Sequence, residues 1–525
     1  METLSLDQAQ ARDWDAIVIG AGLGGGIAGR RLAEEGLSVL FIEKGAAGYP
    51  TEENGTGNRA KSPEARLLRG LWPKMVEARV GGTTQQFFAP IGSGAGGSSV
   101  FYAAALERPE PHDLDDLPGL PHPAGGWPVG FDAFGPWFDE AARIMHLCGT
   151  DDPLSGAAPL PLNDPPPARE TDTATLEDLR ALGLHPYRLN LALKTPATCQ
   201  SCFGHKCPRA CKMDGRSAGV RPALATGRAG LLTYADVENI RAADGRVTGV
   251  RVRKDGAEVD LSASVYILAA GALGSPRLLL ASDVANSSGW VGRGLMFHLN
   301  EMFALWPGNR MPEGETPSKS VALRDIYTKD GARFGMVQSM GLEASYGNIY
   351  HHLTQVFDRS PLRRVRTLRD LLRIPAAIAA RVFGNAGIYV GFIEDFPLPE
   401  NRVVLNATDP EVLTFEYRYT PELLARRTAF RRAIKAGLKG RRMFFLSQSP
   451  ALNYGHPSGT LRFGTDPATS VLNPDCRAHD LDNLYVADAS FMRSSLGVNP
   501  SLTIVANALR VADIIARRQP RAEAA

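Results

Sequence analysis

The chain reads DAIVIGAGLGGG at residues 15–26, IAGRRLAEEG at residues 27–36 and SVLFIE at residues 38–43. The two apolar runs are short and continuous, which is typical of parallel strands buried on both faces. Between them, a glycine-rich stretch leads directly into a segment of helical composition that ends at Gly36. This order of strand, tight turn, helix, strand and acidic residue predicts the βαβ unit of an α/β fold.

The glycines of this segment have separate tasks in such a unit. Gly20 permits the tight turn, Gly22 lets the backbone approach a pyrophosphate, and Gly25 lets the helix and strand pack closely. The helix start offers N–H groups and a partial positive charge to phosphates, and Glu43 can accept hydrogen bonds from ribose hydroxyls. We therefore predict a dinucleotide site, although this unit alone does not distinguish FAD from NAD.

The composition is that of a large globular protein. Hydrophobic residues make up 44% of the 525 residues and charged residues 22%, which excludes disorder or coiled coil as the main architecture. The net charge is only +2, so the overall charge does not favour a nucleic-acid partner. Neither a signal peptide nor a run of about 18 apolar residues is present, which leads us to expect a cytoplasmic protein without a membrane span.

Further motifs follow in order along the chain. They are GGSS at 96–99, GALGSP at 271–276, GRGLMFH at 292–298, NYGHPSGT at 453–460, LYVADAS at 484–490 and NPSLT at 499–503. Together with the N-terminal unit they resemble the glucose–methanol–choline (GMC) oxidoreductase family over nearly the whole chain. The resemblance implies an α/β protein with a Rossmann-type FAD-binding domain, similar to that of glutathione reductase. It also implies a discontinuous α+β substrate domain built on an antiparallel sheet.

The resemblance also divides the chain between these two domains. Residues 10–48, 78–105, 212–300 and 450–520 would form the FAD-binding domain, and residues 106–211 and 301–449 the substrate domain. Residues 385–420 alternate apolar and polar side chains, as expected of an antiparallel sheet with one covered face. We expect that sheet to cover the flavin.

By resemblance, the protein oxidises the CH–OH group of a small-molecule alcohol to a carbonyl, with hydride passing to N5 of the flavin. His456 would act as the base and Asn499 would orient the hydroxyl, since an imidazole can take a proton near neutral pH. Asn499 precedes Pro500 and an apolar helix, whose N-terminus would direct positive charge at the flavin. A dehydrogenase with an external electron acceptor is favoured, and an oxidase using O2 or a non-redox lyase on the same fold are the alternatives.

Other positions are assigned to the cofactor by resemblance alone. Gly97 and Ser98 belong to the glycine-serine motif, Asp488 ends an apolar run as the acid that contacts the flavin, and Val237 lies in the segment near adenine. Pro500 completes the set beside Asn499. A simple strand end is the competing interpretation for Asp488 and Val237.

Four of the six cysteines lie within 13 positions, at Cys199, Cys202, Cys207 and Cys211. Thiolates at such spacing can converge on a metal ion or cluster, and His205 could replace one ligand. Some sugar dehydrogenases of the family carry an iron–sulfur cluster in their flavin subunit. An iron–sulfur cluster, a zinc site, a local disulfide and a loop of unpaired thiols stay open as alternatives.

Residues 361–383 read PLRRVRTLRDLLRIPAAIAARVF and place arginines beside leucines at helical spacing. A basic amphipathic helix of this kind can lie on anionic lipid, which makes peripheral membrane contact one hypothesis. An ordinary solvated lid helix broken at Pro375 is the alternative.

Overall fold

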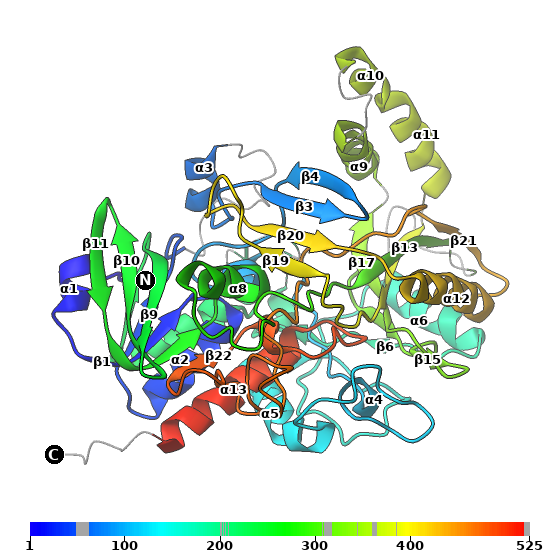
Figure 1. The fold of residues 1–525 in the computed structure, drawn as a ribbon. Coiled ribbons are helices and arrows are strands. Elements are labelled where there is room, and N and C mark those ends of the chain that lie inside the picture. The colour runs from blue at the N-terminus through cyan, green and yellow to red at the C-terminus, as the bar shows by residue number, and fades with distance from the viewer. Residues whose placement is uncertain are drawn as a thin grey trace.

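The structure is a computed structural model that describes residues 1–48, 62–199, 202, 204, 206–207, 209–306, 308, 318–343, 345–359, 365–384 and 386–518. One half of the molecule is built on a five-stranded sheet, in which every neighbouring pair of strands is parallel (Figure 1). Its order is β22 (Leu484–Val486), β12 (Ala263–Leu268), β1 (Trp14–Ile19), β2 (Val39–Ile42) and β8 (Ala229–Leu232).

The predicted βαβ unit is confirmed. Strand β1 leads through Gly20 into α2 (Leu23–Glu34), and β2 returns to pair with β1. All four residues of β2 are buried, as expected of a parallel strand covered on both faces. Helix α2 contacts the C-terminal helix α13 (Ser501–Arg518), which in turn contacts α5 (Phe131–Ile144).

A smaller antiparallel sheet and a helix adjoin the parallel sheet. The sheet has the order β11 (Ala257–Leu261), β10 (Arg246–Lys254) and β9 (Asp236–Ala243), and β10 also contacts β12. Helix α8 (Gly271–Ser282) follows β12 and contacts β9. Because α8 begins directly after a strand of the parallel sheet, its N-terminus lies at the carboxyl edge of that sheet, where ligands of such folds bind.

A six-stranded antiparallel sheet forms the centre of the other half. Its order is β21 (Arg442–Phe445), β13 (Leu299–Trp306), β18 (Gly387–Ile393), β17 (Val337–Glu343), β14 (Val321–Leu323) and β6 (Tyr187–Arg188). Helix α12 (Pro421–Gly437) covers one face of this sheet. The Phe430 ring of α12 lies so close to Gly391 of β18 that a Cβ on Gly391 would come within 2.6 Å of it.

The expectation of a single antiparallel sheet over residues 385–420 is wrong. Strand β18 belongs to the six-stranded sheet, whereas β19 (Arg402–Val404) and β20 (Thr414–Tyr417) join a separate four-stranded sheet. There β20 pairs in parallel with β3 (Val76–Val80), which pairs with β4 (Thr83–Phe87). All seven residues of β18 are buried, so that strand has no solvent face.

Three helices form an arm that projects from the six-stranded sheet (Figure 1). They are α9 (Tyr346–Arg359), α10 (Arg366–Leu371) and α11 (Arg373–Phe383), inserted between β17 and β18. The break in the predicted 361–383 helix falls at Leu372, not at Pro375. Pro375 lies in the first turn of α11, where a residue without an N–H loses no helical hydrogen bond. Residues 361–364 lie outside the described part of the chain.

The remaining elements lie between those already described or at the N-terminus. They are α1 (Leu6–Gln10), α3 (Pro63–Leu68), η1 (Gly97–Val100), α4 (Pro111–Leu114), β5 (Leu147–Cys148), α6 (Glu170–Ala181), β7 (Leu191–Ala192), η2 (Pro196–Thr198), η3 (Gly215–Val220), α7 (Arg221–Ala225), β15 (Thr328–Lys329), β16 (Ala332–Arg333) and η5 (Ala489–Phe491). Within the described residues, no helix has the length and apolar composition needed to cross a bilayer.

Candidate active site

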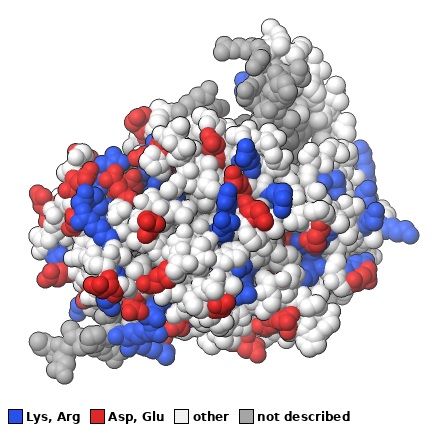
Figure 2. All heavy atoms as spheres, viewed as in Figure 1, with Lys and Arg blue, Asp and Glu red and all other residues white. Residues whose placement is uncertain are grey.

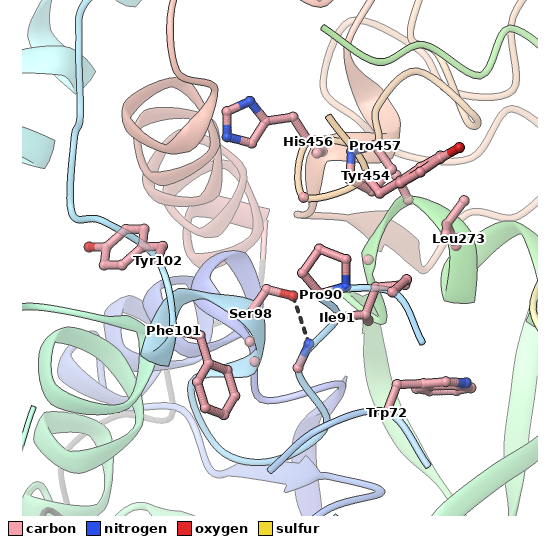
Figure 3. Close-up of a pocket in the computed structure, with 18 of the residues that line it drawn as sticks. Trp72, Pro90, Ile91, Ser98, Phe101, Tyr102, Leu273, Tyr454, His456 and Pro457 are labelled. Atoms are coloured by element: carbon pink, nitrogen blue, oxygen red, sulfur yellow. Dashed lines mark hydrogen bonds between the residues drawn. The ribbon is translucent and has the colours of Figure 1, made fainter. Parts of the chain in front are cut away.

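One large cavity of about 1160 Å³ lies where the two halves meet. Its walls come from the glycine loop after β1, η1, the start of α8, strands β17 and β18, and the loops before β22 and α13. All four of His456, Ser98, Leu273 and Trp72 line the cavity, and in Figure 3 His456 lies above Ser98, with Leu273 and Trp72 to the right. The volume exceeds the ~300–1,000 Å³ of an ordinary small-molecule pocket, so a long ligand and a substrate have room together.

The glycines of the predicted dinucleotide motif differ in how much space surrounds the position of a Cβ atom. A Cβ on Gly20 would come within 2.5 Å of Ala269 O, and one on Gly25 within 2.1 Å of Gly20 O. Those two positions are glycine because of the protein's own packing. A Cβ on Gly22 would have no protein atom nearer than 4.0 Å, yet Gly22 lines the cavity. At Gly22, therefore, the open space is available to a ligand.

Glu43 closes the glycine loop against the end of β2. Its Oε2 accepts a hydrogen bond from Ala21 N at 3.0 Å and its Oε1 accepts one from Gly45 N at 2.9 Å. Burial raises the pKa of this carboxyl, and these N–H donors oppose that effect. The side chain also lines the cavity, so it holds the loop in place and borders the ligand space.

Gly97, Ser98 and Val237 also line the cavity. Gly97 begins η1, and Ser98 Oγ accepts a hydrogen bond from Gly92 N at 2.9 Å, drawn as the dashed line in Figure 3. Val237 lies in β9 and is buried. These three residues therefore border the same space as the glycine loop.

Asp488 lines the cavity, but protein donors surround its carboxylate. Gly271 N (2.8 Å) and Ser275 Oγ donate to Oδ2, and Ser490 N (2.9 Å) and Ser490 Oγ donate to Oδ1. The side chain thus joins the start of α8 to the loop after β22. The structure gives Asp488 this bracing role, and a direct contact with the flavin stays a prediction.

Two segments far apart in sequence bring His456 and His298 together. Backbone hydrogen bonds from Asn453 N to His298 O (2.9 Å) and in both directions between Met296 and Ser458 join them. The two Nδ1 atoms lie 2.9 Å apart, and His298 Nε2 lies 2.9 Å from Leu496 O. His456 lines the cavity, whereas His298 is fully buried behind it.

The hydrogen-bond partners fix the tautomers of this pair. Burial lowers the pKa of His298 to about 4, so that its ring is neutral at neutral pH and carries one hydrogen. A carbonyl can only accept, so this hydrogen is on Nε2 and faces Leu496 O. His298 Nδ1 must then accept from His456 Nδ1–H, which leaves the lone pair of His456 on Nε2. Asn453 Nδ2, 3.2 Å from His456 Nδ1, is then a contact and not a hydrogen bond.

The environment of His456 keeps it unprotonated. Burial lowers the pKa of His456 well below its ordinary value, and the neighbouring His298 and Lys319 lower the pKa further. Lys319 is buried in the cavity wall, and burial lowers its own pKa to about 8. A neutral His456 with a free Nε2 lone pair is ready to accept a proton.

Asn499 lies on the same cavity, immediately before Pro500 and α13. Its side chain is buried, and its Oδ1 has no hydrogen-bond partner among the described residues. Pro500 and Ser501 also line the cavity, so the positive end of the α13 dipole lies at the cavity wall. The predicted pair, His456 and Asn499, therefore borders one space together with the predicted dinucleotide motif.

Family models identify the chain. The N-terminal GMC oxidoreductase model matches residues 14–300 and the C-terminal one matches residues 397–508. The chain belongs to the GMC oxidoreductase family. The predicted family and the FAD-binding Rossmann-type fold are thereby confirmed.

Curated relatives of this GMC oxidoreductase are named as oxidases and dehydrogenases. It is 29% identical to 6'''-hydroxyparomomycin C oxidase of Streptomyces lividus, over 96% of this chain and 92% of the relative. It is 29% identical to paromamine 6'-oxidase of Streptomyces fradiae, over the same shares. It is 27% identical to 2-methyl-1,2-propanediol dehydrogenase of Mycolicibacterium austroafricanum, over 98% of this chain and 96% of that one.

Solved structures share the fold of this GMC oxidoreductase. Pyridoxine 4-oxidase from Mesorbium loti superposes with a TM-score of 0.61 at 20% identity, covering 97% of this chain and all of that one. A fungal aryl-alcohol oxidase superposes with a TM-score of 0.60 at 17% identity, covering 96% and 99%. At such identities the likeness concerns the fold alone.

The cavity of this GMC oxidoreductase suits FAD, the cofactor of its family. The space beside Gly22 admits a pyrophosphate at the start of α2. Buried polar atoms on the wall have no hydrogen-bond partner among the described residues, and a bound ligand would satisfy them. They are Ser93 Oγ, Asn300 Oδ1, Gln338 Oε1 and Asn499 Oδ1.

The cysteine loop does not support a metal centre. Cys207 Sγ lies 3.3 Å from Cys211 Sγ, and none of the four cysteines is joined in a disulfide. Across the described side chains, no three Cys, His, Asp or Glu residues form a group that could hold a metal ion. The iron–sulfur and zinc predictions for Cys199, Cys202, Cys207 and Cys211 are therefore unsupported. His205 lies outside the described residues.

The sequence does not predict the role of two further residues of this site. His298 belongs to the GRGLMFH motif, to which no role is assigned, and Lys319 lies in a region without motifs. The partners of His298 are 158 and 198 residues away in the chain, so no local pattern indicates its role. The sequence signal that points to His298 is its place in the GRGLMFH motif.

Proposed function

We propose that this GMC oxidoreductase oxidises a CH–OH group of a small-molecule alcohol to a carbonyl. The observation that supports the proposal is that a neutral His456, the amide of Asn499 and the dinucleotide loop all line one cavity. FAD, when bound, supplies the chemistry of accepting hydride from the alcohol carbon. The relatives named as oxidases and as a dehydrogenase support alcohol oxidation as the reaction class.

In this proposal the chain moves one proton and holds one oxygen. His456 Nε2 takes the hydroxyl proton, while His298 holds the other ring nitrogen of His456 in place. Asn499 orients the hydroxyl oxygen, and the positive end of α13 stabilises negative charge that develops near Pro500. Gly22, Glu43, Gly97, Ser98 and Val237 would border the cofactor.

The proposed division into domains follows the strands. All five strands of the parallel sheet fall within residues 10–48, 212–300 and 450–520, which we assign with residues 78–105 to FAD binding. Residues 106–211 and 301–449 would hold the substrate. The six-stranded sheet borders the cavity through five side chains, which are Asn300, Gln338, Met340, Val390 and Phe392.

Anaerobic reduction of the bound flavin tests the proposal. In the His456→Ala and Asn499→Ala variants, reduction by an alcohol substrate should slow by roughly 10²- to 10⁴-fold while the flavin stays bound. His185→Ala is the matched control, because that imidazole is half-exposed and does not line the cavity. Reduction at the wild-type rate in both active-site variants would contradict the assignment.

The same experiment separates the alternatives. A lyase would convert its substrate without bleaching the flavin, whereas alcohol oxidation bleaches it in the absence of oxygen. Paromamine and 2-methyl-1,2-propanediol belong in the panel of alcohols because relatives carry these names. Reoxidation by O2 compared with an electron-accepting dye then separates an oxidase from the favoured dehydrogenase.

A further inference from the structure

The helical arm, defined as α9, α10 and α11, carries apolar side chains that the rest of the described chain does not cover. Ile374 and Ile378 are each 60% exposed, and Val382 is 50% exposed. These residues recur every four positions on α11 and therefore lie on one helix face. Leu371, at the end of α10, is 56% exposed three residues before Ile374. Single exposed apolar residues are ordinary, but a continuous stripe of them indicates an interaction surface.

The opposite face of α11 packs against the protein. Ala376 is fully buried and α11 contacts α9, so the stripe lies on the face of α11 that is turned away from α9. At the root of the arm, the rings of Phe383 and Trp306 stack with centroids 5.7 Å apart. Phe383 also approaches Phe444, which is 51% exposed and extends the apolar surface onto β21.

Positive charge accompanies this apolar surface. Residues 365–384 contain four arginines, at 366, 369, 373 and 381, against the single acid Asp370. The chain as a whole is nearly neutral, at +2, so the excess is local. Arg373 and Arg381 are exposed, and Arg442 lies over the Trp306 ring at the root of the arm.

The arm projects from the body and, where it is not grey, presents mostly uncharged atoms in the view of Figure 2. An exposed apolar stripe flanked by arginines is the composition of a helix that lies in the interface of an anionic bilayer. A protein partner with an apolar groove would match the stripe, but the excess of arginine favours a surface that is both apolar and anionic.

We propose that the helical arm docks this protein on the surface of an anionic membrane, with Ile374, Ile378 and Val382 in the headgroup–acyl boundary and the arginines at the phosphates. The arm is rooted beside the cavity: Met340 lines the cavity and packs in the same apolar cluster as Phe383 and Trp306. Docking would therefore bring the substrate side of the cavity close to lipid. This inference does not depend on the proposed alcohol oxidation.

Sedimentation of the holoenzyme with vesicles tests the proposal. Vesicles of phosphatidylcholine with phosphatidylglycerol should bind the protein at low salt and release much of it at high salt, and pure phosphatidylcholine should bind little. The double variant Ile374→Glu/Ile378→Glu should reduce the partition coefficient at least tenfold. Arg373→Gln/Arg381→Gln should weaken binding and flatten its salt dependence.

Two controls keep the result specific. Leu154→Glu/Leu405→Glu changes side chains of similar exposure, 47% and 43%, that lie outside the arm, and should leave binding unchanged. Flavin content and turnover of a soluble substrate should match the wild type in every arm variant, because none of these residues lines the cavity. A variant that retains its flavin and loses vesicle binding thus separates docking from catalysis and folding.

Three results would overturn the proposal. The first is the absence of salt-sensitive binding to anionic vesicles, and the second is binding that the arm variants leave intact. The third is a wild-type protein that does not bind vesicles but forms a dimer, which Ile374→Glu/Ile378→Glu dissociates. Sedimentation velocity without vesicles measures that third case, which would instead assign the stripe to a second copy of this chain.

Discussion

His298 controls which ring nitrogen of His456 carries the hydrogen. The hydrogen bond between the two Nδ1 atoms keeps that hydrogen on His456 Nδ1, because His298 Nε2–H is committed to Leu496 O. Without an acceptor at His298, the proton of His456 is free to occupy either ring nitrogen, and part of the population would lose its base. His298 is therefore a positioning residue in the proposed reaction.

We expect His298→Phe to slow anaerobic flavin reduction by about tenfold or more, and His298→Asn to slow it less. Phenylalanine fills the space without an acceptor, whereas the Asn amide oxygen can still accept from His456 Nδ1–H. Flavin content and melting temperature report whether either variant is merely unstable. Equal rates for the two variants would show that the acceptor is not what matters.

Lys319 contributes to the low pKa of His456 through its positive charge. Burial is the largest cause of the low pKa of His456, followed by His298 and then by the positive charge of Lys319. Below its own pKa of about 8, Lys319 is cationic and opposes a second positive charge nearby. Removing this charge must raise the pKa of His456.

In Lys319→Met, the acid limb of the rate of flavin reduction should therefore move to higher pH. The rate falls where the base becomes protonated, and a higher pKa brings that fall at a less acidic pH. Lys319→Arg keeps the charge and should leave the limb near its wild-type position. A limb that moves equally in both variants, or in neither, would remove the electrostatic role of Lys319.

At the scale of an element, the glycine loop before α2 combines two kinds of glycine. Gly25 is required by packing, since its Cβ would lie 2.1 Å from Gly20 O and 3.0 Å from Val18 Cγ1. Gly22 has φ −74° and free space around it, so an alanine there strains nothing in the protein. Only a ligand against Gly22 would exclude the methyl group.

We expect Gly22→Ala to fold normally but to lose FAD, and Gly25→Ala to lose stability whether or not FAD is present. Overpacking at Gly25 should cost ~3 kcal/mol or more. Purified Gly22→Ala should contain at least tenfold less flavin than the wild type, with an unchanged far-UV CD spectrum. Full flavin content in Gly22→Ala would place the pyrophosphate elsewhere.

The difference between local and distant contacts explains which elements the sequence predicts. The β1–α2–β2 unit follows from residues within about 30 positions of one another, so its periodicity and glycines are sufficient. Strands β18 and β20 are close in sequence but join different sheets, because β20 pairs with β3, more than 300 residues earlier. For the same reason the sequence does not predict the contact between His298 and His456. Backbone hydrogen bonds between two segments far apart in the chain bring these residues together.

At the scale of the molecule, the cavity connects two halves with different sheets. Its wall includes Gly22 and Val237 from the half with the parallel sheet, and Gln338 and Phe392 from the half with the antiparallel one. A cofactor that fills this space contacts residues that are otherwise separated by the cavity. Bound FAD should thus stabilise the whole chain and not one half alone.

Removal of FAD should therefore lower the melting temperature of the whole protein in one transition, and added FAD should restore it. At a free concentration of 100 times Kd, a ligand that binds only the folded state adds about 2.7 kcal/mol to the free energy of unfolding.

NAD should have no effect at the same concentration, because the family of this chain binds FAD, although the βαβ unit alone fits either dinucleotide. Gly22→Ala apoprotein should melt like wild-type apoprotein and respond to neither. Stabilisation of the wild type by NAD and not by FAD would contradict the cofactor assignment, and with it the proposed transfer of hydride from the alcohol.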